Sequence, residues 1–338
     1  MTSTIDRELD WFVSFPERAG AHLTVERLAD YGWLVRPRGV VSEVLPGGKR
    51  IALTLMGITH GNEWAGLAVL NHLLALLDSR VCTLTVPVAF LLGNPWAARE
   101  NRRFRECDLN RSFARPAPTL AEEQRAADLA PVLADSAYLV DFHQTARVSG
   151  RPFFIFPFNR NSFGFARDVA PRLTVVTHWG KPFSAEGMCT DEYVNSQGGT
   201  GISLELGQNG FDPYQIAVGV EASLWALQAA THYLRDGVPP GRLVASRLPA
   251  EPEIYTWAEI VPWPAQGVVE LDEDWTNFKS VAQGQALGKL DGRPLLAPAS
   301  GLMLFPKFLT REQQANLTTR PTELCRIMRR VGVDALPE

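Results

Sequence analysis

Short apolar runs alternate with stretches of helical periodicity through the first two thirds of the chain. The runs at 50–58, 86–94 and 137–144 are bounded by turn-forming residues, and such runs are typical of buried strands. Between them, residues 63–77 and 119–135 repeat their apolar side chains at helical spacing. Strands that alternate with helices predict an α/β fold with a mixed, largely parallel sheet flanked by helices.

The pattern changes beyond a Pro- and Gly-rich linker near residue 240. Helical periodicity becomes scarce there, and short strand-like runs are separated by Gly and Pro turns. We therefore predict a main catalytic domain over 1–240 and a smaller C-terminal β domain over 245–338, which would act as a lid or an oligomerisation element. We also predict three individual elements: a short helix at 25–31, a strand at 40–44 and a terminal helix at 319–333.

The composition excludes several classes of protein. The 338 residues are 46% hydrophobic and 21% charged, as in ordinary globular proteins. A net charge of −4 argues against nucleic acid as the main partner, because such partners require a basic face. The longest apolar stretches are too short to cross a membrane. The first residues show no signal-peptide pattern, so we expect a cytoplasmic protein.

Polar side chains stand where the predicted strands end. His60 and Asn94 follow two strands, His143 closes a third, and Glu63 comes three residues after His60. In parallel sheets, sites form outside the carboxyl ends of the strands. Two imidazoles and one carboxylate leave a fourth coordination position open for water, which is the arrangement of a catalytic zinc site. Taken singly, each of these residues is as compatible with a structural role, because an H-x-x-E pair is common by chance and a lone histidine is often a core residue.

Five short segments share the order and spacing of one enzyme family. They are G-I-T-H-G-N-E (57–63), N-P (94–95), R-R-F-R-E-C-D-L-N-R-S-F (102–113), D-F-H (141–143) and L-E-L-G (204–207). Over residues 40–230 the chain resembles the succinylglutamate desuccinylase/aspartoacylase family, a branch of the zinc carboxypeptidase fold. The family has D-L-H-x-T where this chain has D-F-H-Q-T (141–145). Phe142 thus replaces a leucine, an apolar exchange that leaves the histidine in place. The resemblance implies a zinc-carboxypeptidase-like sheet flanked by helices.

The resemblance also implies roles for four residues. It makes His60, Glu63 and His143 the ligands of one Zn²⁺ per chain, and Glu205 the catalytic carboxylate. Amide hydrolysis needs a base that takes a proton from water and an acid that protonates the leaving amine, and one carboxylate of raised pKa can do both in turn. Glu205 stands in an apolar strand, where burial would raise its pKa. Without the family likeness, Glu205 is more readily a solvent-facing carboxylate on an edge strand.

Arginines crowd the segment 99–115, which holds six of them against three acidic residues. Arginine binds carboxylates through two parallel hydrogen bonds, so a pocket lined in this way favours anionic substrates. The resemblance implies that Asn110 and Arg111 hold a substrate carboxylate and that Arg103 polarises the scissile carbonyl. Arg102 stays an alternative for that last role, because it adjoins Arg103.

Two further side chains have open assignments. Asp108 would orient either Arg111 or a metal-binding histidine. Arg147 follows the third strand and would bind the acyl carboxylate of a diacid substrate.

These features together predict a zinc-dependent hydrolase that cleaves a linear amide bond. It would be a deacylase of amino-acid metabolism that acts on a small anionic N-acyl amino acid similar to N-succinylglutamate or N-acetylaspartate. One alternative is a zinc carboxypeptidase acting on short peptides, because one fold supports several chemistries. An alternative of another class is a metal- or ligand-binding module without catalysis. We expect no nucleic acid or membrane partner and leave room for a homo-oligomer.

Overall fold

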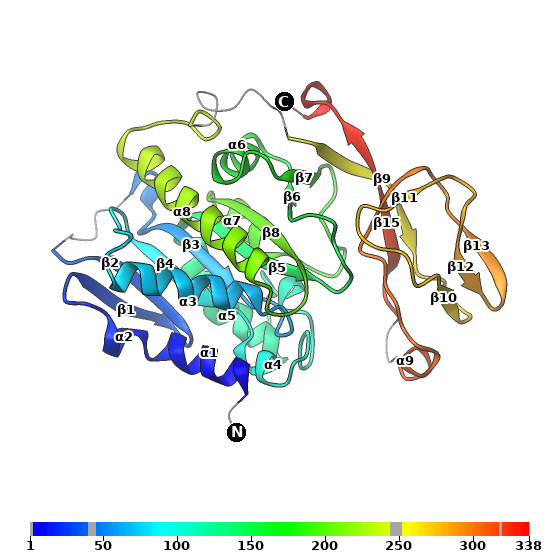
Figure 1. The fold of residues 1–338 in the computed structure, drawn as a ribbon, viewed down its shortest axis with the longest axis horizontal. Coiled ribbons are helices and arrows are strands. Elements are labelled where there is room, and N and C mark those ends of the chain that lie inside the picture. Colours follow the sequence, from blue (N-terminus) through cyan, green and yellow to red (C-terminus); the bar gives the residue numbers. More distant parts are fainter. Residues whose placement is uncertain (1–2, 40–44, 244–251, 318–319, 338) are drawn as a thin grey trace.

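The computed structural model of the chain describes residues 3–39, 45–243, 252–317 and 320–337, so the strand expected at 40–44 lies outside the described residues. One twelve-stranded sheet runs through the molecule in the order β1-β2-β4-β3-β5-β8-β6-β7-β9-β15-β14-β11 (Figure 1). A three-stranded sheet has the order β10-β12-β13. The strands are β1 (Leu23–Ala29), β2 (Gly32–Pro37), β3 (Ile51–Gly57), β4 (Val88–Leu92), β5 (Ser136–Thr145), β6 (Phe153–Pro157), β7 (Thr174–His178), β8 (Thr200–Gln208), β9 (Ile254–Pro262), β10 (Val269–Leu271), β11 (Ser280–Val281), β12 (Ala286–Leu290), β13 (Arg293–Leu296), β14 (Gly301–Leu304) and β15 (Glu323–Val331).

The centre of the large sheet is parallel. Strand β3 pairs in parallel with β4 on one side and with β5 on the other, and β5 pairs in parallel with β8. Strand β6 reverses direction beside β8, and β7 and β9 then run parallel to β6. The remaining neighbours pair in antiparallel fashion. Strands buried on both faces read as continuous apolar runs, as β3 does. This mixed sheet confirms the predicted α/β fold class.

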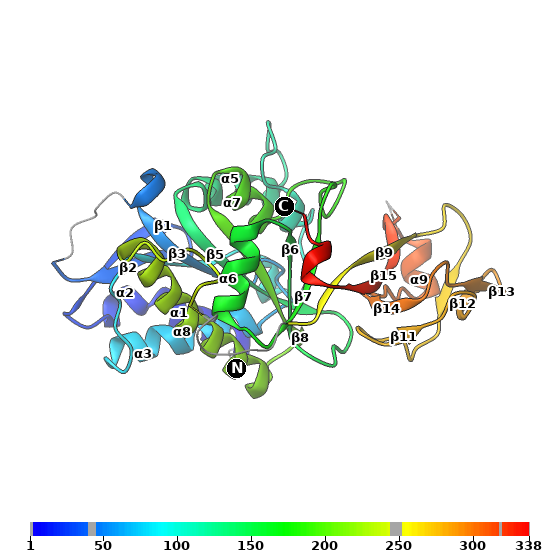
Figure 2. The ribbon, with the colours of Figure 1, turned by 90° about the horizontal axis from the view of Figure 1, so that it is seen from above.

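Helices cover both faces of this sheet (Figure 2). One apolar core takes buried side chains from α1, α3, α6 and α8, and the second core takes them from α5 and α7. No helix in the described part of the chain combines the length and the hydropathy that a bilayer crossing requires. The helices are α1 (Thr4–Val13), α2 (Phe15–Arg18), α3 (Ala65–Asp78), α4 (Pro95–Arg99), α5 (Ala121–Ala134), α6 (Arg160–Val169), α7 (Thr190–Ser196), α8 (Pro213–Arg235) and α9 (Arg311–Ala315), with 3₁₀ turns η1 (Pro46–Gly48), η2 (Leu109–Arg111) and η3 (Val333–Ala335).

Two expected helices are strands. The prediction of a helix at 25–31 is wrong, because Leu23–Ala29 form β1, which pairs with β2. The prediction of a terminal helix at 319–333 is also wrong, because Glu323–Val331 form β15 between β9 and β14. Leu, Arg, Glu and Met favour helices in isolation, but this preference is weak. In β15, pairing on both sides and burial of the inward side chains outweigh it.

The C-terminal strands form a smaller lobe beside the larger one (Figures 1 and 2). This lobe has its own apolar core, which includes Trp263 and Trp275. The large sheet continues into it, because β9 pairs with β7 through the partners Val175↔Ile254 and Val176↔Tyr255. The sheet therefore crosses the boundary expected from the sequence, and the division into two domains stays a prediction.

Candidate metal centre and active site

The turn between β3 and α3 carries His60 and Glu63. Because β3 ends at Gly57 and α3 begins only at Ala65, both side chains belong to the turn rather than to the helix. Ile58 opens this turn with a φ of 45°, a left-handed conformation that is strained for a β-branched residue. Strain of this kind costs on the order of 1–3 kcal/mol and concentrates at functional sites.

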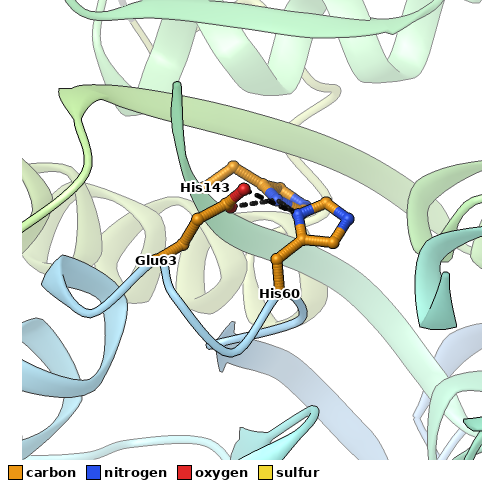
Figure 3. A group of neighbouring side chains, drawn as sticks. All are labelled: His60, Glu63 and His143. Atoms are coloured by element: carbon orange, nitrogen blue, oxygen red, sulfur yellow. Dashed lines mark hydrogen bonds and ion pairs between the residues drawn. The ribbon is translucent and has the colours of Figure 1, made fainter. Parts of the chain in front are cut away.

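Three side chains from this turn and from β5 converge on one point (Figure 3). His60 Nδ1 lies 2.8 Å from Glu63 Oε1, and His143 Nδ1 lies 2.9 Å from Glu63 Oε2. The two Nδ1 atoms are 3.2 Å apart. The ligand atoms of the three residues all lie within 4.8 Å of one another, and all three residues are buried. This group could hold a metal ion.

Carboxylates orient both imidazoles of this group from behind. His143 Nε2 lies 3.0 Å from Asp141 Oδ2, and His60 Nε2 lies 3.1 Å from Asp108 Oδ1. When each Nε2 donates its proton to its carboxylate, both Nδ1 lone pairs point at Glu63. Three acceptors then face one another in a buried space, which is stable only with a cation among them. The donor set therefore fits a metal ion. The Asp108 carboxylate contacts His60, whereas Arg111 donates its backbone N–H to the Asp108 carbonyl at 3.0 Å.

Charges within the group shift the pKa values of its members. Burial opposes the charged form of His143, but the carboxylates of Asp141 and Glu63 raise its pKa well above the ordinary value. Burial likewise opposes the ionised form of Glu63, but His60 and His143 lower its pKa well below the ordinary value. Without a metal, a proton on His143 therefore supplies the cation that the ligands require.

Arg103 lies directly beside the His60-Glu63-His143 group. Its guanidinium donates to Glu63 Oε1 at 3.2 Å and to Asp108 Oδ2 at 3.1 Å, and its side chain is 43% exposed. Its Nη2 also lies 2.8 Å from His60 Nε2. This nitrogen could accept a hydrogen bond only if the imidazole proton were on Nδ1, and a metal bound at Nδ1 excludes that tautomer. Arg102 instead pairs with Glu100 at 3.3 Å. Of the two neighbouring arginines, the structure places only Arg103 at the site.

The arginine-rich loop is held in place from two sides. The Gly61 N–H donates to the Arg103 carbonyl at 3.0 Å, which ties the loop to the metal-binding turn. On the other side, the buried Glu122 carboxylate accepts the backbone N–H groups of residues 105, 106 and 107 at 2.6, 3.1 and 3.1 Å. Asn94 donates to the same carboxylate at 3.0 Å, so this strand-end residue supports the loop instead of contacting the metal group. The sequence offers no signal for Glu122, because acids are common in the first turn of any helix.

Glu205 lies on β8, directly across from His143 on β5. Its side chain is buried, and Oε2 has no hydrogen-bond partner among the described residues. Burial, with smaller contributions from the carboxylates of Glu63 and Asp141, raises the pKa of Glu205 to about 8, although His143 and Arg103 oppose the shift. The site therefore contains a carboxyl group that can exchange a proton near neutral pH.

Asn110 and Arg111 lie on the turn η2, next to the start of α7. Asn110 Oδ1 accepts the backbone N–H of Thr190 at 2.9 Å. Arg111 donates to Cys189 Sγ at 3.2 Å and stacks over Phe183 at 5.0 Å. Within the described ranges no carboxylate forms an ion pair with the Arg111 guanidinium, although the charges of Asp108, Glu186 and Glu192 act on it and help to raise its pKa against burial.

Known proteins resemble this chain in sequence and in structure. The sequence model of the succinylglutamate desuccinylase/aspartoacylase catalytic domain matches residues 49–229, more than half of the chain. The chain belongs to this family. The family resemblance expected from the five sequence segments is thereby confirmed.

Individual proteins resemble this family member over most of their length. It is 27% identical over 299 residues to a succinylglutamate desuccinylase of Serratia proteamaculans, with 82% of this chain and 86% of the relative covered. The crystal structure of succinylglutamate desuccinylase from Vibrio parahaemolyticus superposes with a TM-score of 0.68 at 17% identity, covering 93% of this chain and 90% of the other. Murine aminoacylase 3 superposes with a TM-score of 0.55 at 19% identity, covering 83% of this chain and 96% of the other. At these identities the two structures show a shared fold.

A lysine of the C-terminal lobe of this family member interacts electrostatically with Arg103. Burial, with the positive charges of Arg103 and Arg326, lowers the pKa of Lys307, although Glu323 at 3.8 Å opposes the shift. Arg147 instead stacks over Phe308 at 4.0 Å, so its contacts lie with the C-terminal lobe and not with the metal-binding residues. The sequence analysis did not identify Lys307 as a site residue, because the proximity of the two lobes is not visible in the sequence.

Proposed function

We propose that the protein is a zinc-dependent amidohydrolase that removes the acyl group from a small N-acyl amino acid. The observation that carries this proposal is a buried Glu205 carboxyl, whose Oε2 has no partner in the described part of the chain, beside a His60-Glu63-His143 group. The family and its named relatives support the same chemistry. Two nitrogen ligands and one carboxylate suit zinc and leave a coordination position for water.

Glu205 is the proton carrier of the proposed reaction. When bound, zinc supplies a water molecule of lowered pKa and polarises the scissile carbonyl. Its charge would also lower the pKa of Glu205 from the value of about 8, so that the carboxylate can accept a proton from the attacking water. Glu205 then returns this proton to the departing amine, because one group serves as base and acid in turn.

Arginines provide the charge that binds and polarises the substrate. Arg103 is half exposed beside Glu63, where its guanidinium stabilises the negative charge that develops on the acyl oxygen. Asn110 and Arg111 bind a carboxylate of the amino-acid half. We extend the proposal to Lys307 and Arg147, which would attract a second carboxylate of the substrate from the side of the C-terminal lobe.

The C-terminal lobe limits substrate length in this proposal. Because the charges of Lys307 and Arg103 interact, we propose that the lobe stands at one side of the site. A walled site accepts a compact acyl amino acid and rejects a longer peptide. Oligomerisation through this lobe is the other role that we keep open for it.

A release assay on a small panel tests the function. N-succinylglutamate, N-acetylaspartate, N-acetylglutamate and a short peptide are each incubated with the protein as purified, after chelation and after zinc is restored. We expect hydrolysis of at least one acyl amino acid, loss on chelation and recovery with zinc. Glu205→Gln should remove activity while Glu221→Gln, an exposed carboxyl on α8, should not. Hydrolysis of the peptide alone would replace this proposal with a carboxypeptidase.

A further inference from the structure

Thr190 is fully buried at the start of α7 and contacts both halves of the site. Its hydroxyl donates to Asp141 Oδ2 at 2.6 Å, and its backbone N–H donates to Asn110 Oδ1 at 2.9 Å. Asp141 belongs to the metal side, and Asn110 belongs to the side expected to bind the substrate carboxylate. No other residue in the described ranges has hydrogen bonds to both of these side chains.

The contact with Asp141 acts on a metal-binding histidine. The oxygen that accepts the Thr190 hydroxyl, Asp141 Oδ2, is the same atom that lies 3.0 Å from His143 Nε2. The Thr59 hydroxyl donates to the same carboxylate and lies 2.8 Å from Oδ1 and 3.0 Å from Oδ2. Two hydroxyl groups therefore fix the rotation of a fully buried carboxylate, and this carboxylate sets which nitrogen of His143 is free to bind a metal.

The contact with Asn110 acts on the side of the site that is expected to bind the substrate carboxylate. Because Asn110 Oδ1 accepts the Thr190 N–H, the amide is held with a defined orientation, and its Nδ2 donor is directed elsewhere. The neighbouring residue Cys189 accepts a hydrogen bond from Arg111 at 3.2 Å. Consecutive residues at the start of α7 thus hold both members of the pair expected to bind the substrate carboxylate.

We propose that Thr190 is a positioning residue that fixes His143 through Asp141 and orients Asn110 through its backbone. The part of this proposal that concerns Asp141 and His143, the metal half, stands on the geometry alone. The part that concerns Asn110, the substrate half, rests on the function proposed above. Two substitutions separate these halves. Thr190→Val removes the hydroxyl but keeps the N–H and the shape. Thr190→Pro removes both, and proline is tolerated at the first position of a helix after an extended residue such as Cys189.

Zinc affinity, measured on the metal-free protein by competition with a chromophoric chelator, tests the metal half. We expect Thr190→Val to bind zinc roughly 10–100-fold more weakly, as for other residues that support a ligand from behind, and Thr190→Ser to recover the affinity to within a few-fold. Thr177→Val is the matched control, because Thr177 is equally buried and its hydroxyl donates to the Phe156 carbonyl at 2.9 Å and to no other described residue. Unchanged affinity in Thr190→Val, or an equal loss in Thr177→Val, overturns the metal half.

Binding of glutamate to the zinc-loaded proteins, followed by calorimetry, tests the substrate half without any turnover. We expect Thr190→Val to bind glutamate as the natural protein does and Thr190→Pro to bind it several-fold more weakly. Equal affinity in the two variants, or no glutamate binding by the natural protein, overturns this half. If Thr190→Val fails to fold, Thr190→Ala removes the same hydroxyl with a smaller side chain. A protein that hydrolyses no acyl amino acid but loses zinc affinity in Thr190→Val refutes the proposed function and keeps the metal half.

Discussion

His143 and Glu205 are Cα partners on the neighbouring parallel strands β5 and β8. The register of two central strands, rather than a loop, thus sets the separation between an imidazole of the candidate metal group and the buried carboxyl that would move the proton. Sites built on strands hold their side chains more rigidly than sites built on loops. Because this pairing is rigid, we expect a substitution of the Glu205 side chain to leave the His60-Glu63-His143 group in place.

Glu205→Gln should abolish hydrolysis and leave zinc binding in place. The amide keeps the shape of the side chain but cannot accept or return a proton, and loss of such a group costs roughly 10²–10⁴-fold in rate. Steady-state kinetics and the zinc content of the purified variant check this. A variant that keeps more than a tenth of the rate would remove Glu205 from the proposed mechanism.

The same variant should change how stability depends on pH in the metal-free protein. The folded-state pKa of Glu205 is about 8, above its ordinary value of 4.5, so the folded protein keeps a proton that the unfolded chain has lost. Stability therefore falls as pH rises from about 4.5 towards 8. Glu205→Gln lacks this loss, so its Tm relative to the natural protein should increase across that range. Parallel Tm curves for the two proteins would contradict the raised pKa.

Zinc binding should release protons. Asp141 and Glu63 raise the pKa of His143 well above its ordinary value even though burial opposes this, so the metal-free site carries a proton at neutral pH. A metal ion must displace that proton, so affinity should weaken as the pH falls. Calorimetric titrations in two buffers of different ionisation enthalpy measure the number released, which we expect to be at least one. A result of zero would show that the imidazole is already neutral.

Arg103 and Arg102 form a matched pair for testing electrostatic stabilisation. Arg103→Ala should lower kcat by roughly 10²–10³-fold, because it removes the donor beside the reacting carbonyl. Arg102→Ala should change kcat little, because this side chain pairs with Glu100 on an exposed part of the loop. Equal effects of the two substitutions would remove the assignment of Arg103.

Glu122→Gln should weaken the arginine-rich loop without touching the metal group. An amide at this position offers one acceptor where the carboxylate receives three backbone N–H groups, and each buried donor left unpaired costs about 1–3 kcal/mol. We expect a lower Tm and a reduced kcat/KM with unchanged zinc affinity. The exposed Glu221→Gln serves as control. A loss of zinc affinity equal to the loss of kcat/KM would show that the loop cannot be weakened without disturbing the metal group.

Much of the catalytic part was readable from the sequence. Apolar runs of strand length separated by helical stretches predicted the parallel centre of the sheet, because burial on both faces makes a strand such as β3 almost entirely apolar. The spacing of His60 and Glu63 predicted that both side chains face one point, at the start of a helix or in a turn, and the structure brings them together with the distant His143. The strands β1 and β15 were not readable, because their composition favours a helix and only partner strands decide otherwise.

The sequence by itself determined the donor types, the order of the strands and helices that carry them, and membership of the family. Only the tertiary structure decided which groups support these donors: Asp141 behind His143, Glu122 beneath the arginine-rich loop, and Thr190 between Asp141 and Asn110. The physical reason is that a ligand type and a periodic pattern are local properties of the chain. Hydrogen bonds between buried groups far apart in sequence exist only after the sheet has set its register and the helices have packed on it.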